Sequence, residues 1–473
     1  MPKIKGIKLP KIERVPFKMP TREEMEAMAA ASGGGPGPGG PGGPGGPGAM
    51  PKSIPAIYIK DGKYVAKESG KESVKAGKIG NAAASGVKIS ADDASTGGIF
   101  VEGKDSEFTL SDAEINLSGS TRGLGGKSSG AAVGNHGTLI LKNVNITTGG
   151  TARCASAAQD YGTLKVYNST LISHGVPFDA VVKTADMSPD MMTPPAALEI
   201  EGNCRTHCTM TNGKSYFYDS TIIADGWAAL STDMSDGYVY LEANKCKVKT
   251  VNSGYGTYSD CMCHNFFNDC DFDVACMAAI IAEESDCTFT NTSAKCGTYF
   301  ALIHAVFGST AEVSTLNVTG GDIKTKSPVV VVKSQNALIN FEAVKMASKC
   351  GILIQSKWNN DPSATRTKGQ KVYGIHATFK NMNVAGDIVH EDPDRNMYIY
   401  LKSTALKGVI RDAHVSFDAK SKWTATEYSK ITLVGDIDLA QIDAPENITV
   451  VAIAAESGTY KLASGGYLVL RTA

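Results

Sequence analysis

Seven short apolar segments of the sequence each close on a charged or basic side chain. These side chains are Lys183, Asp233, Asp260, Glu283, His304, Lys333 and Lys357. Neighbouring strands of a parallel sheet lie about 4.8 Å apart. If the segments are successive strands, we expect the three carboxylates to form one column, which His304 and Lys333 continue.

Such a column would suit acid–base catalysis. Like charges at that spacing disfavour joint ionisation, so one carboxyl group would hold a proton and serve as a general acid. Carboxylates about 5 Å apart suit a nucleophile and acid pair, whereas carboxylates on alternate coils suit water-mediated inversion. His304 and Lys333 could polarise a substrate oxygen or accept a proton from carbon. The expected catalytic residues are Asp233, Asp260, Glu283 and His304.

Further residues near the column are expected to bind a substrate. Tyr258 and His264 flank Asp260, while Arg205 and His207 stand beside a long excursion, residues 175–195, that is rich in Met and Pro. Excursions of this kind often wall a site. The expected binding set is Lys333, Tyr258, His264, Arg205, His207 and Lys183. The alternative is a solvated edge, because strand ends are polar wherever a chain leaves a core, and a one-residue register error moves a side chain to the other face.

The strands that must position these residues are indicated by pairs of small or apolar residues two positions apart. The pairs are Ala113/Ile115, Val144/Ile146, Ser169/Leu171, Leu198/Ile200, Ser220/Ile222, Cys246/Val248, Cys270/Phe272, Cys287/Phe289, Leu316/Val318, Val344/Met346 and Met382/Val384. Residues at i and i+2 of a strand point the same way. A strand that returns about every two dozen residues, with no helix between, predicts a solenoid. The expected fold is all-β, a right-handed parallel β-helix with these pairs in its interior.

Composition shifts divide the chain into four expected regions. Residues 1–32 form an extended arm and a short amphipathic helix that begins at a capping box, Thr21 to Glu24. Residues 33–48, rich in Gly and Pro, form a flexible linker. Residues 49–418 form the β-helix, and 419–473 form C-terminal coils that cap its open end. The arm could dock on a neighbouring copy, making a homo-oligomer, or on a scaffold, or remain a disordered tail.

Coils such as GTLILKNVNITTGG, YGTLKVYNSTLISHG and GKSYFYDSTIIADGW resemble those of the pectin-lyase-like right-handed β-helix superfamily. The resemblance covers roughly residues 98–473 and implies the fold. That superfamily holds lyases, galacturonases, epimerases, tailspikes and adhesins, so the resemblance implies no single activity. None of the catalytic signatures of its pectin-degrading members is present, and no residue role is carried over.

The charge balance and the cysteine positions limit the classes of partner and cofactor that the chain is expected to bind. The chain of 473 residues has 47 Lys and Arg against 48 Asp and Glu, which gives no electrostatic case for nucleic acid or a membrane surface. Without an apolar leader segment, the expected location is the cytoplasm. Cys246, Cys270 and Cys287 are expected to stack in successive coils as small apolar side chains. Neither a metal nor another cofactor is therefore expected.

The expected function is a metal-free acid–base enzyme, a lyase, isomerase or hydrolase, acting on a small hydroxylated substrate. A sugar acid, an oligosaccharide or a polyhydroxylated aromatic would fit. The alternative is a non-catalytic β-helix for carbohydrate binding, adhesion or scaffolding. Exposed aromatic rows on one face would favour binding, but in the sequence the tyrosines look scattered, as at Tyr216, Tyr218, Tyr238 and Tyr255. His136, His376, His390 and His414 are expected to be surface or turn residues.

Overall fold

The regular structure of the chain is almost entirely β-strand. The computed structural model describes residues 2–9, 12–14, 53–121, 124–177, 193–195, 198–233, 238–305, 312–359 and 373–472. Within these ranges there is no α-helix, only the 3-10 turns η1 (Lys71–Ser73), η2 (Gly126–Ser128) and η6 (Leu439–Gln441). The expected N-terminal helix and the Gly/Pro linker lie outside the described residues.

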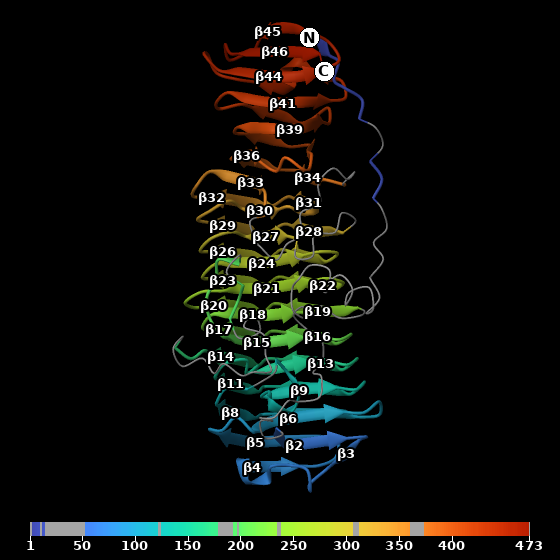
Figure 1. Ribbon diagram of the computed structural model, residues 1–473, viewed down its shortest axis with the longest axis vertical. Coiled ribbons are helices and arrows are strands. Elements are labelled where there is room, and N and C mark those ends of the chain that lie inside the picture. The colour runs from blue at the N-terminus through green and yellow to red at the C-terminus, as the bar shows by residue number, and fades with distance from the viewer. Residues whose placement is uncertain are drawn as a thin grey trace, which may run out of the picture. The chain divides into compact units, whose positions relative to one another are not determined.

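The chain divides into two compact units, which we describe separately. Unit 2 comprises residues 17–276, and unit 1 comprises residues 1–16 and 277–473. In both units the chain winds through short strands that pair in parallel with strands of the next coil (Figure 1). We call the three strands of a coil A, B and C in chain order. This arrangement is a parallel β-solenoid, as the returning strands predict.

Unit 2 contains most of the residues discussed below. Its A strands are β7 (Glu107–Ser111), β10 (Thr138–Lys142), β13 (Thr163–Tyr167), β16 (Lys214–Tyr218), β19 (Val239–Asn244) and β22 (Cys263–Asn268). Its B strands are β8 (Glu114–Ser118), β11 (Asn145–Gly149), β14 (Thr170–His174), β17 (Thr221–Ala224), β20 (Lys247–Thr250) and β23 (Asp271–Val274). Its C strands are β2 (Ile54–Lys60), β6 (Thr96–Glu102), β9 (Ala131–Gly134), β12 (Ser156–Ala158), β15 (Cys204–Thr209), β18 (Trp227–Thr232) and β21 (Tyr255–Asp260). The unit begins less regularly, with β3 (Lys63–Tyr64) antiparallel to β2 and β4 (Val74–Ile79) antiparallel to β5 (Ala83–Ala91).

Unit 1 repeats the pattern. Its A strands are β25 (Asp286–Thr290), β28 (Val313–Thr319), β31 (Asn336–Glu342), β34 (Ile375–Lys380), β37 (Met397–Lys402), β39 (Ile410–Phe417), β41 (Ser429–Val434), β44 (Thr449–Ala454) and β46 (Tyr467–Thr472). Its B strands are β26 (Ser293–Cys296), β29 (Asp322–Thr325), β32 (Lys345–Ser348), β35 (Asn383–Ala385), β38 (Ala405–Lys407), β40 (Lys422–Thr424) and β43 (Ile442–Asp443). Its C strands are β24 (Met277–Ala282), β27 (Ala301–His304), β30 (Val330–Lys333), β33 (Ile352–Lys357) and β36 (Asp387–His390), and β45 (Gly458–Lys461) folds back against β46.

The interior of unit 2 is built from the predicted apolar positions. Along the B strands, buried side chains follow one another in register: Ile115, Ile146, Leu171, Ile222, Val248 and Phe272. Two details of the prediction are wrong. Leu198 and Ile200 lie outside any strand, and the pairs Cys287/Phe289 and Leu316/Val318 belong to the neighbouring A strands β25 and β28, and not to the B column. The short gap from Cys270 to Cys287 marks this change of strand, which periodicity alone does not reveal.

The turn from each A strand to the next B strand in unit 2 has a repeated hydrogen-bond pattern. Its first residue has a left-handed backbone in six coils, at Asp112, Asn143, Asn168, Asp219, Lys245 and Asp269. The next side chain accepts a hydrogen bond from the backbone of the preceding coil: Val144 N–H donates to Ser169 Oγ (3.0 Å) and Ser169 N–H donates to Ser220 Oγ (3.1 Å). Small polar residues therefore recur at this position because they link successive coils.

The N-terminal arm packs on the last coils of its own unit. Strand β1 (Lys3–Ile4) pairs antiparallel with β42 (Ile437–Asp438), and Ile7 N–H donates to the Leu433 carbonyl at 2.8 Å. Ile4 is fully buried, and Arg14 forms an ion pair with Glu284. Residues 2–9 thus pack as an added segment on the C-terminal coils.

A buried arginine ties together several loops of unit 2. The Arg153 side chain donates to the backbone carbonyls of Asp93, Thr96, Ser118, Gly119 and Ser128. Burial lowers the pKa of this guanidinium to about 10, although the Asp93 charge opposes the shift. The carbonyl oxygens replace the water that the charge loses on burial.

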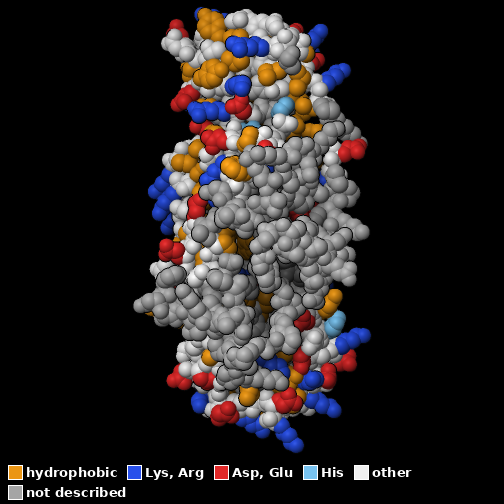
Figure 2. Space-filling model, in the orientation of Figure 1, with side chains coloured by type: hydrophobic (Ala, Val, Ile, Leu, Met, Phe, Trp, Pro, Cys, Tyr) orange, Lys and Arg blue, Asp and Glu red, His pale blue; other side chains and the backbone are white. Residues whose placement is uncertain are grey.

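Acidic and basic side chains are interspersed over the part of the surface that Figure 2 shows in colour. No helix in the described part of the chain is long and apolar enough to cross a membrane.

Candidate functional site

The two aspartates of the expected column occupy matching positions in unit 2. Asp233 follows Thr232 and Asp260 follows Ser259, and Thr232 and Ser259 are register partners on β18 and β21. The Thr232 hydroxyl donates to the buried Asn265 side chain, so Thr232 points inward. Because side chains alternate along a strand, Asp233 points to the outer side of the C strands.

Asp233 meets Arg205 there in an ion pair. Arg205 Nη1 donates to Asp233 Oδ2 at 2.6 Å, and the guanidinium lies 4.2 Å from the ring centroid of Trp227. Burial is the largest single effect and lowers the pKa of Arg205, but Asp233 together with Tyr255, Cys208 and Cys154 outweighs it, so the pKa of the guanidinium is raised. The buried Nε of Arg205 has no hydrogen-bond partner. Sequence reasoning placed both residues near a site, and the structure brings them into contact.

Two tyrosines extend this outer cluster. The Tyr255 hydroxyl lies 2.9 Å from Ser231 Oγ, and the rings of Tyr255 and Tyr258 lie 5.7 Å apart. Burial raises the pKa of Tyr255 above its usual value, with Arg205 opposing the shift. The phenol is therefore a neutral hydrogen-bonding group at ordinary pH. Tyr258, a predicted binding residue, thus lies on the same side of β21 as Asp260.

His207 does not share this outer side, which corrects its expected role. Its Nδ1 lies 2.8 Å from Ser156 Oγ, its Nε2 lies 2.7 Å from Thr209 Oγ1, and its ring meets Phe217 edge to face. The side chain is fully buried, and burial lowers its pKa to about 3. His207 is a neutral core residue, without access to a ligand on the outer side.

The other three members of the expected column belong to unit 1. His304 and Lys333 are register partners on β27 and β30, as predicted, and both are buried. The residue of β24 opposite His304 is Ala282, so Glu283 stands one position beyond that row. Glu283 has a left-handed backbone (φ 54°), and its carbonyl accepts hydrogen bonds from Ser314 and Gln335. The predicted register was therefore one residue out at Glu283. Lys183 and most of residues 175–195 lie outside the described residues.

The outer side of the A strands in unit 2 carries aromatic rows that the sequence did not reveal. We call this surface the tyrosine face; its residues are Tyr167, Tyr216, Tyr218, Tyr238, Tyr240, His264 and Phe266. Ring centroids are 4.9 Å apart for Tyr167 and Tyr218, and 5.4 Å apart for Tyr216 and Tyr240. His264 stacks on Tyr238 at 4.4 Å, so this predicted binding residue lies among tyrosines and on a different strand class from Asp260. Coil lengths vary, which hides these rows in the sequence.

Glu242 supplies a fixed carboxylate within the tyrosine face. Tyr240 donates its hydroxyl to Glu242 Oε2 at 2.6 Å, and Asn244 donates its amide to Oε1 at 2.9 Å. Burial, reinforced by Glu242, raises the pKa values of Tyr216, Tyr218 and Tyr240. The face therefore presents neutral phenol groups around one anchored acceptor.

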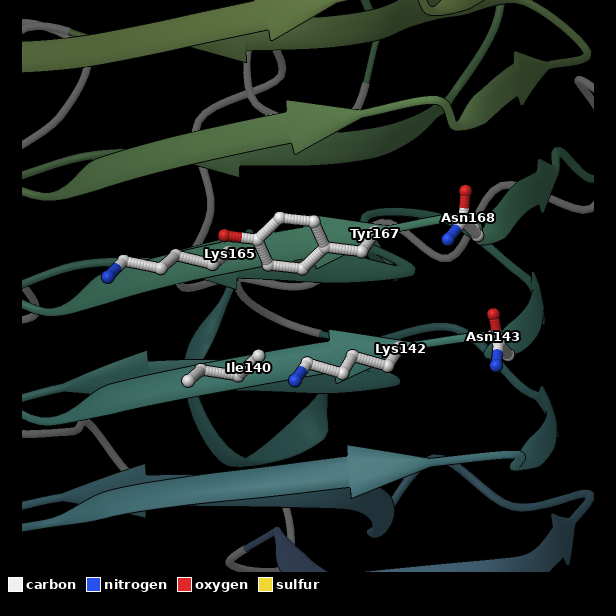
Figure 3. A pocket seen from close by; sticks show the side chains of 6 residues that line it. All are labelled: Ile140, Lys142, Asn143, Lys165, Tyr167 and Asn168. Carbon is white, nitrogen blue, oxygen red and sulfur yellow. The ribbon is translucent and has the colours of Figure 1, made fainter.

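A hollow lies on the same A strands, between β10 and β13. It is lined by Ile140, Lys142, Asn143, Lys165, Tyr167 and Asn168. Ile140 and Lys142 on β10 are register partners of Lys165 and Tyr167 on β13. In Figure 3 the Tyr167 ring is seen broadside, with its hydroxyl pointing towards Lys165. An apolar ring, amides and ammonium groups therefore surround one concave surface.

Metal ligands do not gather in the described ranges: no three His, Cys, Asp or Glu side chains there are placed to hold an ion. Comparison with known proteins adds no further assignment, since no protein-family model, curated protein or solved structure matches the chain.

Proposed function

We propose that the tyrosine face of unit 2 binds carbohydrate. The observation that carries the proposal is the set of aromatic rings on the outer side of β13, β16, β19 and β22, where Tyr167 is the register partner of Tyr218 and Tyr240 is that of His264. Their side chains are half-buried, apart from the more exposed Tyr238. A pyranose has an apolar C–H face and a polar rim, which match a Tyr ring and its hydroxyl.

Glu242 supports the proposal because a carboxylate has more acceptor sites than its two observed donors occupy. A sugar hydroxyl would donate to the remaining lone pairs, as in other sites where a few fixed polar groups orient a ligand. The neutral phenols of Tyr216 and Tyr218 can each donate as well as accept.

Binding of oligosaccharides to the full chain, measured by a glycan array and then by calorimetry, tests the proposal. We expect Tyr218→Ala and Tyr240→Ala each to weaken binding about fivefold, since one aromatic contact contributes about 1 kcal/mol. Tyr240→Phe separates the loss of the ring from the loss of the hydroxyl. Tyr467→Ala, at an exposed tyrosine of unit 1, is the matched control. Equal affinity of all these variants, or no glycan binding by the wild type, would contradict the proposal.

We also infer that the coils are right-handed, as in pectin-lyase-like proteins, because the twist of parallel strands favours right-handed crossovers. The proposed small-molecule partner is thus a glycan bound on the outside of a solenoid, which has no deep cleft of its own.

A second candidate function is acid–base chemistry at the outer side of the C strands in unit 2. The favouring observation is the ion pair of Asp233 and Arg205, in which Arg205 is buried and Asp233 keeps 22% of its side chain exposed. Arg205 would orient Asp233 as a base or charge stabiliser, and Asp260 would be the acid on the neighbouring strand.

Turnover of bound oligosaccharides, followed by mass spectrometry, tests this second candidate. We expect Asp233→Asn and Asp260→Asn to abolish product formation while glycan affinity at the tyrosine face is unchanged. Circular dichroism of each variant checks its fold, because Asp233→Asn leaves Arg205 without its countercharge. Unchanged turnover in both folded variants would rule out catalysis by these aspartates.

A further inference from the structure

The hollow between β10 and β13 carries two positive charges without countercharges. Among the described residues, neither Lys142 nor Lys165 forms an ion pair, and no carboxylate belongs to the six residues that line the hollow. Asp112 lies beside the hollow, next to Asn143, and its carboxylate accepts a hydrogen bond from the Asn143 amide at 3.1 Å. Two ammonium groups around one concave surface repel each other, and an anion bound between them would remove that cost.

The other lining groups suit a sugar better than a bare ion. Asn143 and Asn168 both occupy left-handed turn positions, so the backbone presents their amides at the same end of successive A strands. Ile140 adds an apolar surface to the lining. One wall is Tyr167, whose ring stacks at 4.9 Å on Tyr218 of the tyrosine face. The hollow is therefore continuous with the proposed glycan-binding surface.

From this arrangement we infer that the hollow is an anion subsite, which receives the sulfate or carboxylate group of an acidic sugar. The acidic group lies between Lys142 and Lys165, and the sugar ring packs on Tyr167. Neighbouring sugars of the same chain extend from Tyr167 to Tyr218 and along the tyrosine face. The inference rests on the proposed function and names its ligand class.

Calorimetry of the full chain with three probes of equal length tests the inference: a sulfated oligosaccharide, a uronic acid oligosaccharide and a neutral glucan. We expect at least one acidic probe to bind about tenfold more tightly than the neutral one, with the preference lost at high salt. The two acidic probes distinguish sulfate from carboxylate. Lys142→Ala and Lys165→Ala should each reduce the acidic preference about fivefold and leave neutral glucan binding unchanged. The control is Lys247→Ala, at an exposed lysine of the B strand β20.

The possible results distinguish the anion subsite from the proposed glycan binding by the tyrosine face. The anion subsite would be overturned if all three probes bound with equal affinity, or if the acidic preference persisted in Lys142→Ala and Lys165→Ala. Glycan binding by the tyrosine face would still be supported in both cases. Absence of binding by every probe would overturn both. Tyr240→Ala should weaken all three probes alike, because this residue belongs to the shared face and lies outside the hollow.

Discussion

The backbone amide of Cys246 donates a hydrogen bond to the sulfur of Cys270 in the next coil, at 3.4 Å. The Cys270 thiol in turn approaches the Asn268 carbonyl two residues earlier, at 3.3 Å. Ser169 and Ser220 make the same two contacts through their hydroxyl groups. A thiol thus replaces a hydroxyl as a link between coils, which accounts for cysteine at this position without any metal or disulfide.

Substitutions at Cys270 should follow hydrogen bonding rather than hydrophobicity. We expect Cys270→Ser to change the free energy of unfolding by less than about 1 kcal/mol, because the hydroxyl keeps both contacts. Cys270→Val should cost about 1–3 kcal/mol, since it leaves the Cys246 amide buried without an acceptor. Urea unfolding of the two variants measures the difference. A valine variant as stable as the serine variant would show that the column is held by apolar packing alone.

Arg153 should be among the residues of unit 2 most costly to replace. Its guanidinium serves five backbone carbonyls, and Arg153→Met would fill similar space while leaving those carbonyls without donors. We expect a loss of about 3–5 kcal/mol, comparable to the removal of one partner from a buried charged network. Arg153→Lys should recover only part of it, because an ammonium cannot span the same carbonyls. Chemical denaturation of both variants measures the ranking, and a loss below about 1 kcal/mol for methionine would contradict it.

The N-terminal arm should stabilise the last coils of unit 1. A Cβ added at Gly6 would lie 2.2 Å from the Gly435 carbonyl oxygen, so Gly6→Ala should detach the arm. We expect faster hydrogen exchange at Gly435 and Ala455, whose backbone amides donate to the carbonyls of Ile7 and Lys5, and a lower midpoint of thermal unfolding. Deletion of residues 2–9 should give the same changes. Gly149→Ala is the control, because its nearest neighbour would be an ordinary 3.8 Å away. Unchanged exchange in the deletion variant would mean that the arm contributes no protection.

The fold was predictable because its sequence signal is repeated in many coils. The arrangement of the site residues was not predictable from the sequence. The inward pairs Val144/Ile146 and Cys270/Phe272 recur in many coils, so one irregular coil does not obscure them. The rows of the tyrosine face depend on which residues of unequal coils stand opposite each other, and Tyr216 meets Glu242 only through the observed register. Glu283 shows the same difficulty. Glu283 follows the end of its strand with a left-handed backbone, so counting strand ends places it in the row of His304, whereas the structure has Ala282 opposite His304.

The buried imidazole of His207 should make the stability of the protein depend on acid pH. Burial lowers its pKa to about 3 in the folded protein, whereas an unfolded chain titrates near 6.5. Above pH 6.5 the group is neutral in both states and contributes no pH dependence. Below that pH the unfolded state binds a proton that the folded state excludes, so stability falls as the pH falls from about 6.5 towards 3. The slope from this one group approaches about 1.4 kcal/mol per pH unit.

Urea unfolding at pH 7.0, 6.0, 5.0 and 4.0 measures this slope. His207→Asn should be less stable at pH 7, because it perturbs the contacts with Ser156 and Thr209, but its stability should fall less steeply with acid. Burial also lowers the pKa values of His376, His390 and His414, so part of the slope should remain in the variant. The exposed His136 provides the matched control, His136→Asn, which should keep the wild-type slope. Equal slopes for His207→Asn and the wild type would mean that the imidazole becomes protonated without unfolding, and that the interior of unit 2 admits the charge.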